Sequence, residues 1–298
     1  MERKLFPLLF FILVLQQTIC VKAENNKIQF QGSNCTGKPV ATGFTGQVLY
    51  VSATNDTLIY VFPENNSASI FLTTYNFNTS KWSEGVQMIF NNQISFDNIR
   101  KTSEVKELFV PVKNKKGKWD IYCFQYCNGV CGELEKLNDN INTAFNEKSA
   151  SLSEDENTLY FASDRKGGKG GYDIYKSERL ENGEWGPAQN LGSVVNTKAD
   201  EDSPFILSDN VTLYFSSLAH GSLGGFDIFN STLSEDGIWS VPESAGTSIN
   251  SKSNDLYYYL TADEKILFYS SSVSDNLQQA LNIYEIRNSQ QEFTIKIQ

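Results

Sequence analysis

The sequence repeats itself, and this repeat restricts the fold more than any other feature. When the chain is aligned with itself at an offset of 54 residues, Leu159 coincides with Leu213 and Leu267, and an aromatic residue follows each leucine two positions later. The two most similar copies read TLYFASDRKGGKGGYDIYKS and TLYFSSLAHGSLGGFDIFNS. Two more diverged copies place Leu58 and Leu108 in register, so the leucine recurs five times at a spacing of about 50 to 54 residues. A period of this length indicates an array of similar supersecondary units.

Each unit contains four short strand-like runs, which in the fourth copy read SPFILS, VTLYFSS, FDIFNSTL and IWSVPES. Turn sequences such as ENG and EDG separate such runs, because Asn, Asp and Gly tolerate the positive φ of hairpin turns. Four antiparallel strands at this period are typical of a blade of a β-propeller. We therefore predict an all-β fold, a β-propeller of four-stranded antiparallel blades, over residues 24–298, with units centred near residues 58, 108, 159, 213 and 267.

Five repeats favour five blades. A sixth blade is the alternative, built from residues 26–46 together with the terminal EFTIKIQ, although neither piece carries the LYF landmark. A β-sandwich of regular hairpins is the alternative fold, but it would not explain five copies in register.

Residues 1–23 have the pattern of a secretory signal peptide. Arg3 and Lys4 precede an apolar run over residues 5–15, and the residues that follow predict cleavage after Ala23. The run is shorter than the roughly 20 residues that a membrane-spanning helix needs, and no later segment is apolar for long enough to cross a membrane. We therefore expect an exported protein without a transmembrane segment.

The exported protein is expected in the periplasm, at the outer membrane or outside the cell. Cys20 raises the alternative of a lipid-anchored N-terminus. Ile19 argues against it, because it stands where lipoprotein signals have a small residue.

The charge balance is acidic and argues against a nucleic-acid partner. The chain carries 25 Lys and Arg against 35 Asp and Glu, a formal net charge of −10. Binding to phosphates needs clustered Lys and Arg, whereas this chain is acidic overall.

The glycine-rich loop of the two best copies is the first candidate for a site. Its residues are Gly170, Gly171 and Asp173 in one copy, and Gly224, Gly225 and Asp227 in the next. A phosphate-binding loop must open a helix, whereas YDIYKS reads as a strand. Calcium is a further alternative without the Asp-x-Asp-x-Asp spacing that would support it. We therefore expect the glycines to permit a tight loop and the two aspartates to accept backbone N–H bonds.

Catalytic chemistry has few candidate residues. His220 is the single histidine, and we expect a solvated loop residue. The acidic stretch KADEDSPF, residues 198–205, is predicted to be a solvated loop between two units or a binding contact. Trp82, Trp185 and Trp239 share one repeat position, which favours packing between neighbouring blades over stacking on sugars.

Four cysteines remain after Ala23, and in an oxidising compartment they predict disulfides. Cys127 and Cys131 bracket a short hairpin turn in YCFQYCNGVC, and a three-residue loop would set them opposite each other. We predict the pairs Cys127–Cys131 and Cys35–Cys123 among three connectivities. A zinc site is the alternative, although no histidine lies nearby.

The pattern LYFxS, then GGxDIY, NGxW and NLG, resembles the WD40-like (PD40-type) repeat of TolB-type periplasmic propellers and of propellers fused to OmpA-like peptidoglycan-binding domains. The match is close over residues 150–255, partial over 255–285 and faint over 47–149. The resemblance implies a protein-interaction platform outside the cytoplasm, in envelope or secretion machinery. This chain lacks an appended peptidoglycan-binding domain, and it has five units where the TolB propeller has six.

Together these features favour an exported, non-catalytic propeller that binds a protein partner without a cofactor or a metal. The alternative is a carbohydrate-active propeller that binds or hydrolyses glycans, since paired carboxylates suffice for glycoside hydrolysis. The four arginines that follow Ala23, namely Arg100, Arg165, Arg179 and Arg287, fall in different repeats and non-equivalent loops, which argues against a sialidase cluster. A third reading is a structural matrix component.

Overall fold

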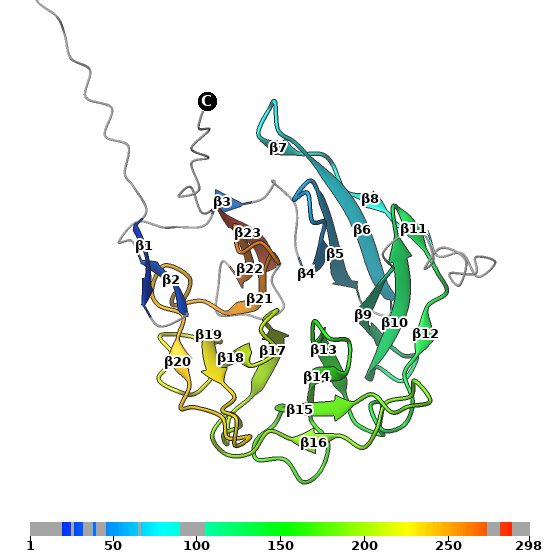
Figure 1. The fold of residues 1–298 in the computed structure, drawn as a ribbon. Helices are drawn as coiled ribbons and strands as arrows, with labels where there is room; N and C mark the ends of the chain where they lie inside the picture. Colours follow the sequence, from blue (N-terminus) through cyan, green and yellow to red (C-terminus); the bar gives the residue numbers. More distant parts are fainter. Residues whose placement is uncertain are drawn as a thin grey trace, which may run out of the picture.

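The structure is a computed structural model, and it describes residues 20–24, 27–31, 38–39, 46–64, 67–89, 105–272 and 281–287. The described residues form strands, turns and loops, and their sheets are arranged as blades around a central axis (Figure 1). The all-β, five-bladed propeller that the repeat predicts is therefore confirmed. No helix in the described part of the chain is long and apolar enough to cross a membrane.

The strands fall into one N-terminal hairpin and five blades. The hairpin pairs β1 (Cys20–Glu24) with β2 (Lys27–Gln31). Blade 1 contains β4 (Gln47–Val51), β5 (Thr57–Glu64), β6 (Ser67–Asn76), β7 (Lys81–Trp82) and β8 (Val86–Gln87). Blade 2 contains β9 (Lys106–Lys113), β10 (Trp119–Cys127), β11 (Val130–Cys131) and β12 (Glu135–Lys136).

The remaining three blades follow in chain order. Blade 3 contains β13 (Glu147–Leu152), β14 (Thr158–Ser163), β15 (Asp173–Glu178) and β16 (Gln189–Asn190). Blade 4 contains β17 (Glu201–Ile206), β18 (Thr212–Ser217), β19 (Asp227–Thr232) and β20 (Glu243–Ser244). Blade 5 contains β21 (Asp255–Leu260), β22 (Ile266–Ser272), β23 (Leu281–Arg287) and β3 (Lys38–Pro39).

Blade 5 is completed by a strand from the beginning of the chain. β3 pairs antiparallel with β23, with Pro39 opposite Tyr284 and Lys38 opposite Glu285. The N-terminal segment 26–46 thus supplies the outermost strand of the fifth blade rather than part of a sixth. Blade 5 therefore joins the two ends of the repeat array.

The repeat register locates β9 within blade 2. Leu108 lies in β9 and aligns with the leucines of β5, β14, β18 and β22, which are the second strands of their blades. Residues 90–104, which precede β9, lie outside the described residues.

The hydrophobic core is divided among the junctions between blades. Each of five buried clusters combines side chains from two neighbouring blades, and together they account for all five junctions. The side chains alternate along each strand, so that a sheet packs on the preceding blade with one face and on the following blade with the other. No blade has a core of its own, so stability depends on contact with its neighbours.

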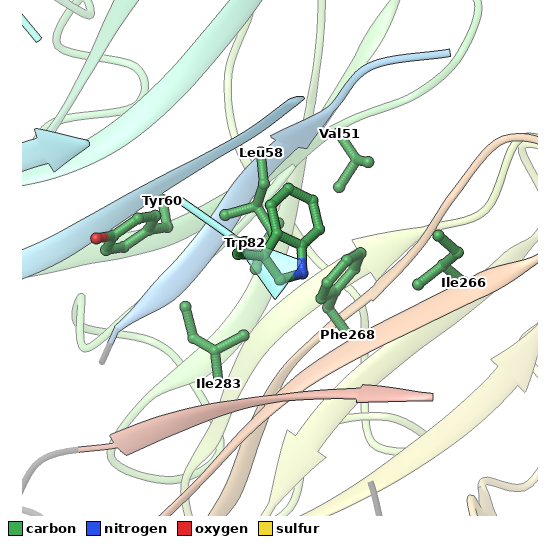
Figure 2. Packing of buried hydrophobic residues seen from close by; sticks show 8 residues of the cluster. Val51, Leu58, Tyr60, Trp82, Ile266, Phe268 and Ile283 are labelled. Carbon is green, nitrogen blue, oxygen red and sulfur yellow. The ribbon is translucent and has the colours of Figure 1, made fainter. Parts of the chain in front are cut away.

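The tryptophans are in these junctions, as their common repeat position predicts. Trp185 packs edge-on against Phe109 of blade 2, and Trp239 packs against Tyr160 of blade 3. Trp82 of blade 1 packs in the same way against Phe268 of blade 5, with ring centroids 6.2 Å apart. Figure 2 shows Trp82 among side chains of both blades. The contact that links consecutive blades elsewhere therefore also closes the ring.

Two faces of the ring differ in the connections that they carry. We call one the mouth face; it bears the turns between first and second strands and between third and fourth strands, at residues 52–56, 153–157, 179–184, 207–211, 233–238 and 261–265. We call the other the glycine-loop face; it bears the loops between second and third strands and the linkers between blades, at residues 114–118, 137–146, 164–172, 191–200, 218–226 and 245–254.

Ring closure through Trp82 predicts that Trp82→Ala destabilises the whole protein. Truncating a buried tryptophan typically costs about 3–5 kcal/mol, from lost burial and from the cavity that is left. Trp119→Ala is the matched control, because Trp119 is only half-buried and its ring contacts the Lys113 ammonium. Denaturant unfolding followed by tryptophan fluorescence and circular dichroism measures both. Equal losses in the two variants would contradict a special role for Trp82.

Candidate binding site at the mouth of the central channel

The glycine-rich loops singled out in the sequence form contacts between blades, because each loop packs against the linker to the next blade; we call this contact the inter-blade clasp. Asp173 accepts hydrogen bonds from the backbone N–H groups of Lys169 and Gly170, and Asp227 accepts one from Leu223. Both aspartates thus accept backbone N–H bonds as predicted, and their contribution to loop stability stays a prediction. The loop that each one folds is held close against the next linker.

The paired glycines allow that close approach. A Cβ added to Gly170 would lie 1.9 Å from the Ala199 carbonyl oxygen, and one added to Gly224 would lie 2.2 Å from the Lys252 carbonyl oxygen. At Gly171 and Gly225 the added atom would meet the side chains of residues 200 and 254. These loops therefore present their glycines to the adjacent linker rather than to a ligand.

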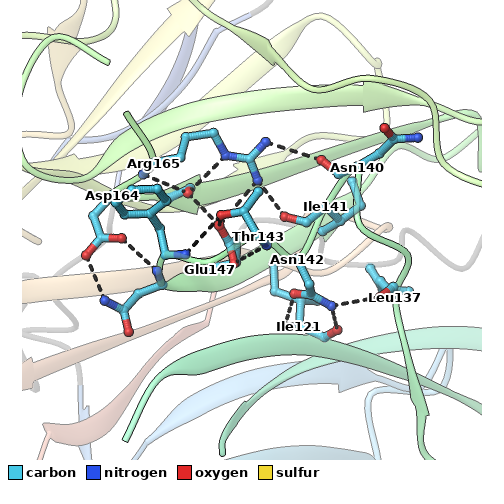
Figure 3. A network of polar contacts seen from close by, with 12 residues as sticks. Ile121, Leu137, Asn140, Ile141, Asn142, Thr143, Glu147, Asp164 and Arg165 are labelled. Carbon is cyan, nitrogen blue, oxygen red and sulfur yellow. Dashed lines mark hydrogen bonds and ion pairs between the residues drawn. The ribbon is translucent and has the colours of Figure 1, made fainter. Parts of the chain in front are cut away.

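Three asparagines that the sequence analysis did not single out attach three linkers to the blades that precede them. The Asn142 side chain accepts a hydrogen bond from the Ile121 N–H and donates one to the Ile121 carbonyl oxygen (Figure 3). Asn196 makes the same pair of bonds to Ile174, and Asn250 makes it to Ile228. A side-chain amide thus extends the hydrogen bonding of the third strand where the sheet's short fourth strand has ended.

A second recurring group is a buried carboxylate at the start of an innermost strand. Glu147, Glu201 and Asp255 are 0 to 1% exposed. Glu147 accepts hydrogen bonds from Thr143 and Ser163 and pairs with Arg165 (Figure 3), and Glu201 accepts from Thr197 and Ser217. Asp255 accepts from the Ser251 N–H and hydroxyl. These groups, the carboxylates at the glycine-loop end of the innermost strands, are too deeply buried to reach a substrate.

Burial changes the acidity of two of these groups. Desolvation raises the pKa of Glu201 above its ordinary value, although the Thr197 and Ser217 hydrogen bonds and His220 oppose the effect. Desolvation likewise raises the pKa of Asp255. The prediction of a solvated acidic loop over residues 198–205 is therefore wrong. Glu201 and Asp202 lie buried in β17, where Asp202 pairs with Lys148 at 2.6 Å.

His220 is also placed differently from the prediction. Its ring packs against Phe215 and Phe229, and Nε2 lies 2.9 Å from the Val195 carbonyl oxygen. In blade 3 the Arg165 guanidinium covers Phe161 and Tyr175, which are the equivalent rings. His220 is therefore a packed residue that fills the position of Arg165, not a solvated one.

The cysteine turn departs from the expected geometry. Cys127 pairs with Val130 and Cys131 with Tyr126, so the loop contains two residues, Asn128 and Gly129, both with positive φ. Cys127 and Cys131 therefore point to opposite faces of the sheet, because neighbouring residues of a strand alternate. The bond between them is not formed, Cys127 and Cys131 are free thiols, and Cys123 has no disulfide partner among the described residues.

Burial raises the pKa of the Cys123 thiol to about 12, with Glu107 and Glu135 adding to the effect, and raises that of Cys131 to about 11. Both groups are therefore poor nucleophiles. Cys35 lies outside the described residues, and its pairing with Cys123 stays a prediction, as do the signal peptide and its cleavage after Ala23.

A central channel opens on the mouth face and is the concave site that the described residues form around the axis. It has a volume of about 500 Å³ and is lined by β4, β13, β17 and β21 together with the start of β9. Tyr50, Phe205 and Tyr259 supply aromatic surface, and Ser151, Ser153 and Ser208 supply hydroxyls. A cavity of this size and mixed lining is within the range of sites that bind small molecules or peptide segments.

The lining strands are bent by bulges at one recurring position. The strand register shifts at Ser149, Ser203 and Tyr257, and each of these residues has a φ between 49° and 57°. The Tyr257 hydroxyl bonds to the Ser149 side chain, and burial raises the pKa of Tyr257. Because blade 4 separates these two residues along the ring, their bond joins blades that are not neighbours.

The rim of the channel is acidic. Glu154, Glu156 and Glu264 are exposed at the opening, and none of them forms an ion pair with another described residue. Asp263 is held by Lys265, Thr261 and Asn55. No group of three or more His, Cys, Asp or Glu in the described part of the chain is arranged to hold a metal ion. The rim thus combines free carboxylates with aromatic rings and hydroxyls deeper in the channel.

Comparisons with known proteins support the fold. No family model matches the sequence, and no curated protein matches it. Among solved structures, the endo-arabinase from Bacteroides thetaiotaomicron VPI-5482 is 17% identical, with a TM-score of 0.53 over 84% of this chain and 97% of that one. The alpha-L-arabinofuranosidase from Lactobacillus brevis is 11% identical, with a TM-score of 0.53 over 84% and 92%.

The putative TolB from Agrobacterium tumefaciens is also similar, at 13% identity and a TM-score of 0.48 over 82% of this chain and 77% of that one. At these identities the comparisons show a shared propeller fold alone.

The inter-blade clasp predicts that Gly170→Ala is strongly destabilising, because the new methyl group would overlap the Ala199 carbonyl oxygen. We expect a loss of about 2–3 kcal/mol, the range for overpacking. Gly183→Ala is the control, since Gly183 has a positive φ and open space around it, which limits its loss to about 1 kcal/mol. Urea unfolding measures both, and an unchanged midpoint for Gly170→Ala would contradict the clasp.

The bracing aspartates predict unequal effects of truncation. Asp173→Ala removes acceptors for Lys169, Gly170 and Asn190, whereas Asp227→Ala removes an acceptor for Leu223 and a second, unpartnered oxygen. We expect the melting temperature to fall in both variants and to fall further in Asp173→Ala, by several degrees for a loss of about 2 kcal/mol. Unchanged melting of both variants would refute the bracing role.

The burial of Glu201 predicts that this residue makes the free energy of unfolding depend on pH. Its folded-state pKa is raised, so its contribution is full below the unfolded pKa of about 4.3 and is lost as the pH rises through the folded value. We expect Glu201→Gln to flatten the decline of unfolding free energy with rising pH above about pH 4 relative to the unsubstituted protein. Glu154→Gln, at an exposed position, serves as the control. A Glu201→Gln profile parallel to the unsubstituted one would contradict the assignment.

Proposed function

We propose that this chain is an exported, non-catalytic propeller of the cell envelope that binds a protein partner at the mouth of its channel. The observation that carries the proposal is the burial of the carboxylates at the glycine-loop end of the innermost strands. Glu147, Glu201 and Asp255 are buried and hydrogen-bonded within their own blades. Glycoside hydrolysis needs two carboxyl groups on opposite sides of a bound sugar, about 5 to 9.5 Å apart, which these residues do not offer to a ligand.

The rim and the channel interior supply charged, aromatic and hydrogen-bonding groups that a polypeptide partner can contact. Glu154, Glu156 and Glu264 are unpaired with described residues and surround an opening whose interior is aromatic and hydroxyl-bearing. Aromatic anchors with hydrogen-bonding groups are typical of the centres of protein interfaces. The free carboxylates fit a partner segment that presents lysine or arginine.

Pull-down from an envelope extract, compared between the unsubstituted protein and a Glu154→Lys, Glu156→Lys, Glu264→Lys variant, tests the proposal. We expect specific partners that the variant loses at least tenfold, because like charges then face each other across the interface. A variant with Glu181→Lys, Glu235→Lys and Asp236→Lys is the control, since it makes the same charge change on mouth-face turns away from the channel lining. Retention of every partner by the rim variant would overturn the proposal.

A carbohydrate-active propeller is the second candidate. The aromatic lining by Tyr50, Phe205 and Tyr259 favours it, since such rings also stack on sugars. The two solved structures with a TM-score of 0.53 carry the names endo-arabinase and alpha-L-arabinofuranosidase. Incubation with arabinan and measurement of reducing ends tests this function directly. Turnover that Glu154→Gln or Glu264→Gln abolishes would replace the binding function by hydrolysis.

A further inference from the structure

The glycine-loop face carries an arc of lysines, although the chain as a whole is acidic. The arc consists of Lys115, Lys116, Lys118, Lys166, Lys169, Lys198 and Lys252, which come from loops and linkers of blades 2 to 5. All of them except the half-buried Lys118 are exposed. None of the seven forms an ion pair with another described residue.

Contacts between loops make the arc continuous. The Lys118 ammonium lies over the Phe145 ring of the next linker, and the neighbouring Asn146 bonds to Asp164 at the start of the loop that carries Lys166 and Lys169. That loop then closes on the following linker, because Gly170 abuts the backbone of residues 198 and 199. The lysines of blade 2, blade 3 and the linker to blade 4 therefore lie on loops that contact one another in sequence around the glycine-loop face.

The arc continues onto the next junction together with exposed apolar side chains. The Leu218 N–H bonds to the Asp200 carbonyl oxygen, two residues beyond Lys198, and Gly224 abuts the Lys252 backbone. Leu218 and Leu223 of this loop are 40% and 53% exposed, and Val194 of the preceding linker is 38% exposed. The loop of Leu218 and Leu223 thus lies between the linkers that carry Lys198 and Lys252.

The loops and linkers of the glycine-loop face include one exposed acidic residue, Asp139, whereas the mouth face carries many. Its exposed turns carry Glu154, Asp155, Glu156, Asp209, Glu235, Asp236, Asp263 and Glu264. Six-residue strands such as β18 separate the two faces by about 20 Å, which is more than twice the Debye length of about 8 Å at physiological salt. A charged surface that approaches the lysine arc therefore interacts mainly with the lysines, despite the negative charge of the whole chain.

We propose that the glycine-loop face docks on an anionic phospholipid surface, with Leu218 and Leu223 inserted between headgroups. Clustered lysines at a flat face supply the electrostatic attraction to anionic lipid, and protruding leucines supply apolar contact at the same depth. An acidic polypeptide would use the lysines alone, which is why the leucines favour lipid. Docking in this way turns the channel mouth and its acidic rim away from the membrane.

Co-sedimentation with vesicles tests the proposal, using the purified full chain with pure phosphatidylcholine vesicles and with vesicles that contain phosphatidylglycerol. We expect stronger binding to the anionic vesicles, and we expect this preference to weaken as salt rises. A preference that is absent at low salt would overturn the proposal. Arg3 and Lys4 also favour anionic lipid, but they are present in every variant, so comparison between variants separates binding through the N-terminal residues from binding through the arc.

Variants locate the binding on the arc. Lys115→Gln, Lys166→Gln and Lys169→Gln together are expected to weaken binding to anionic vesicles about 100-fold, since each lysine near such a surface contributes about fivefold. Lys81→Gln, Lys176→Gln and Lys265→Gln remove the same charge from outside the arc and should leave binding unchanged. An equal loss in the two triple variants would show a net-charge effect and overturn the proposal.

The leucines give an independent readout. Leu223→Ser is expected to weaken anionic-vesicle binding several-fold at all salt concentrations, because it removes apolar contact and no charge. Binding of a polyglutamate peptide by the arc, with no binding of anionic vesicles, would assign the face to an acidic polypeptide and overturn the lipid proposal.

Discussion

The packing of each sheet on its neighbours is the interaction on which the rest of this structure depends. The buried clusters of the described residues lie between blades, and none lies within a single blade. An array of this kind is stable only when both end units are covered, which solenoids achieve with capping repeats. Here the two end units, blades 1 and 5, cover each other because the ring closes. Trp82 of blade 1 packs on blade 5 as Trp185 packs on blade 2 and Trp239 packs on blade 3. The channel, the rim and the two charged faces all follow from that closure.

Polar groups make each junction specific. Apolar packing alone would tolerate sliding of one blade on the next, whereas an asparagine that bonds both the N–H and the C=O of one residue sets a single register. The glycine pairs have a similar role, since they let one loop reach the next linker at a distance that no side chain would permit. The buried carboxylates complete the pattern in blades 3, 4 and 5, each with hydroxyl partners from its own blade. Each of these carboxylates therefore fixes the linker that enters its own blade.

The sequence predicted the features that recur and missed those that depend on one blade's surroundings. The leucine landmark predicted the blades, the shared position of the tryptophans predicted their place between blades, and the GGxD pattern predicted the bracing of the loop by Asp173 and Asp227. The burial of Glu201 and Asp202 was missed because an acidic run reads as solvated, and their partners Lys148, Thr197 and Ser217 come from other strands and linkers. The channel site could not be found from sequence, since its lining comes from five separated segments. The lysine arc was hidden for the same reason, because its members are spread over four blades.

The closed five-bladed ring is the central claim of this account, and amide hydrogen exchange resolved by peptide tests it most directly. A closed ring opens as one unit, so the amides of β5 in blade 1 and of β22 and β23 in blade 5 should be protected to within about tenfold of those of β14 and β18. Fast exchange of the blade 1 and blade 5 strands, beside slow exchange of blades 3 and 4, would show an open array with frayed ends. That result would contradict the closure through Trp82 and β3, and with it the channel.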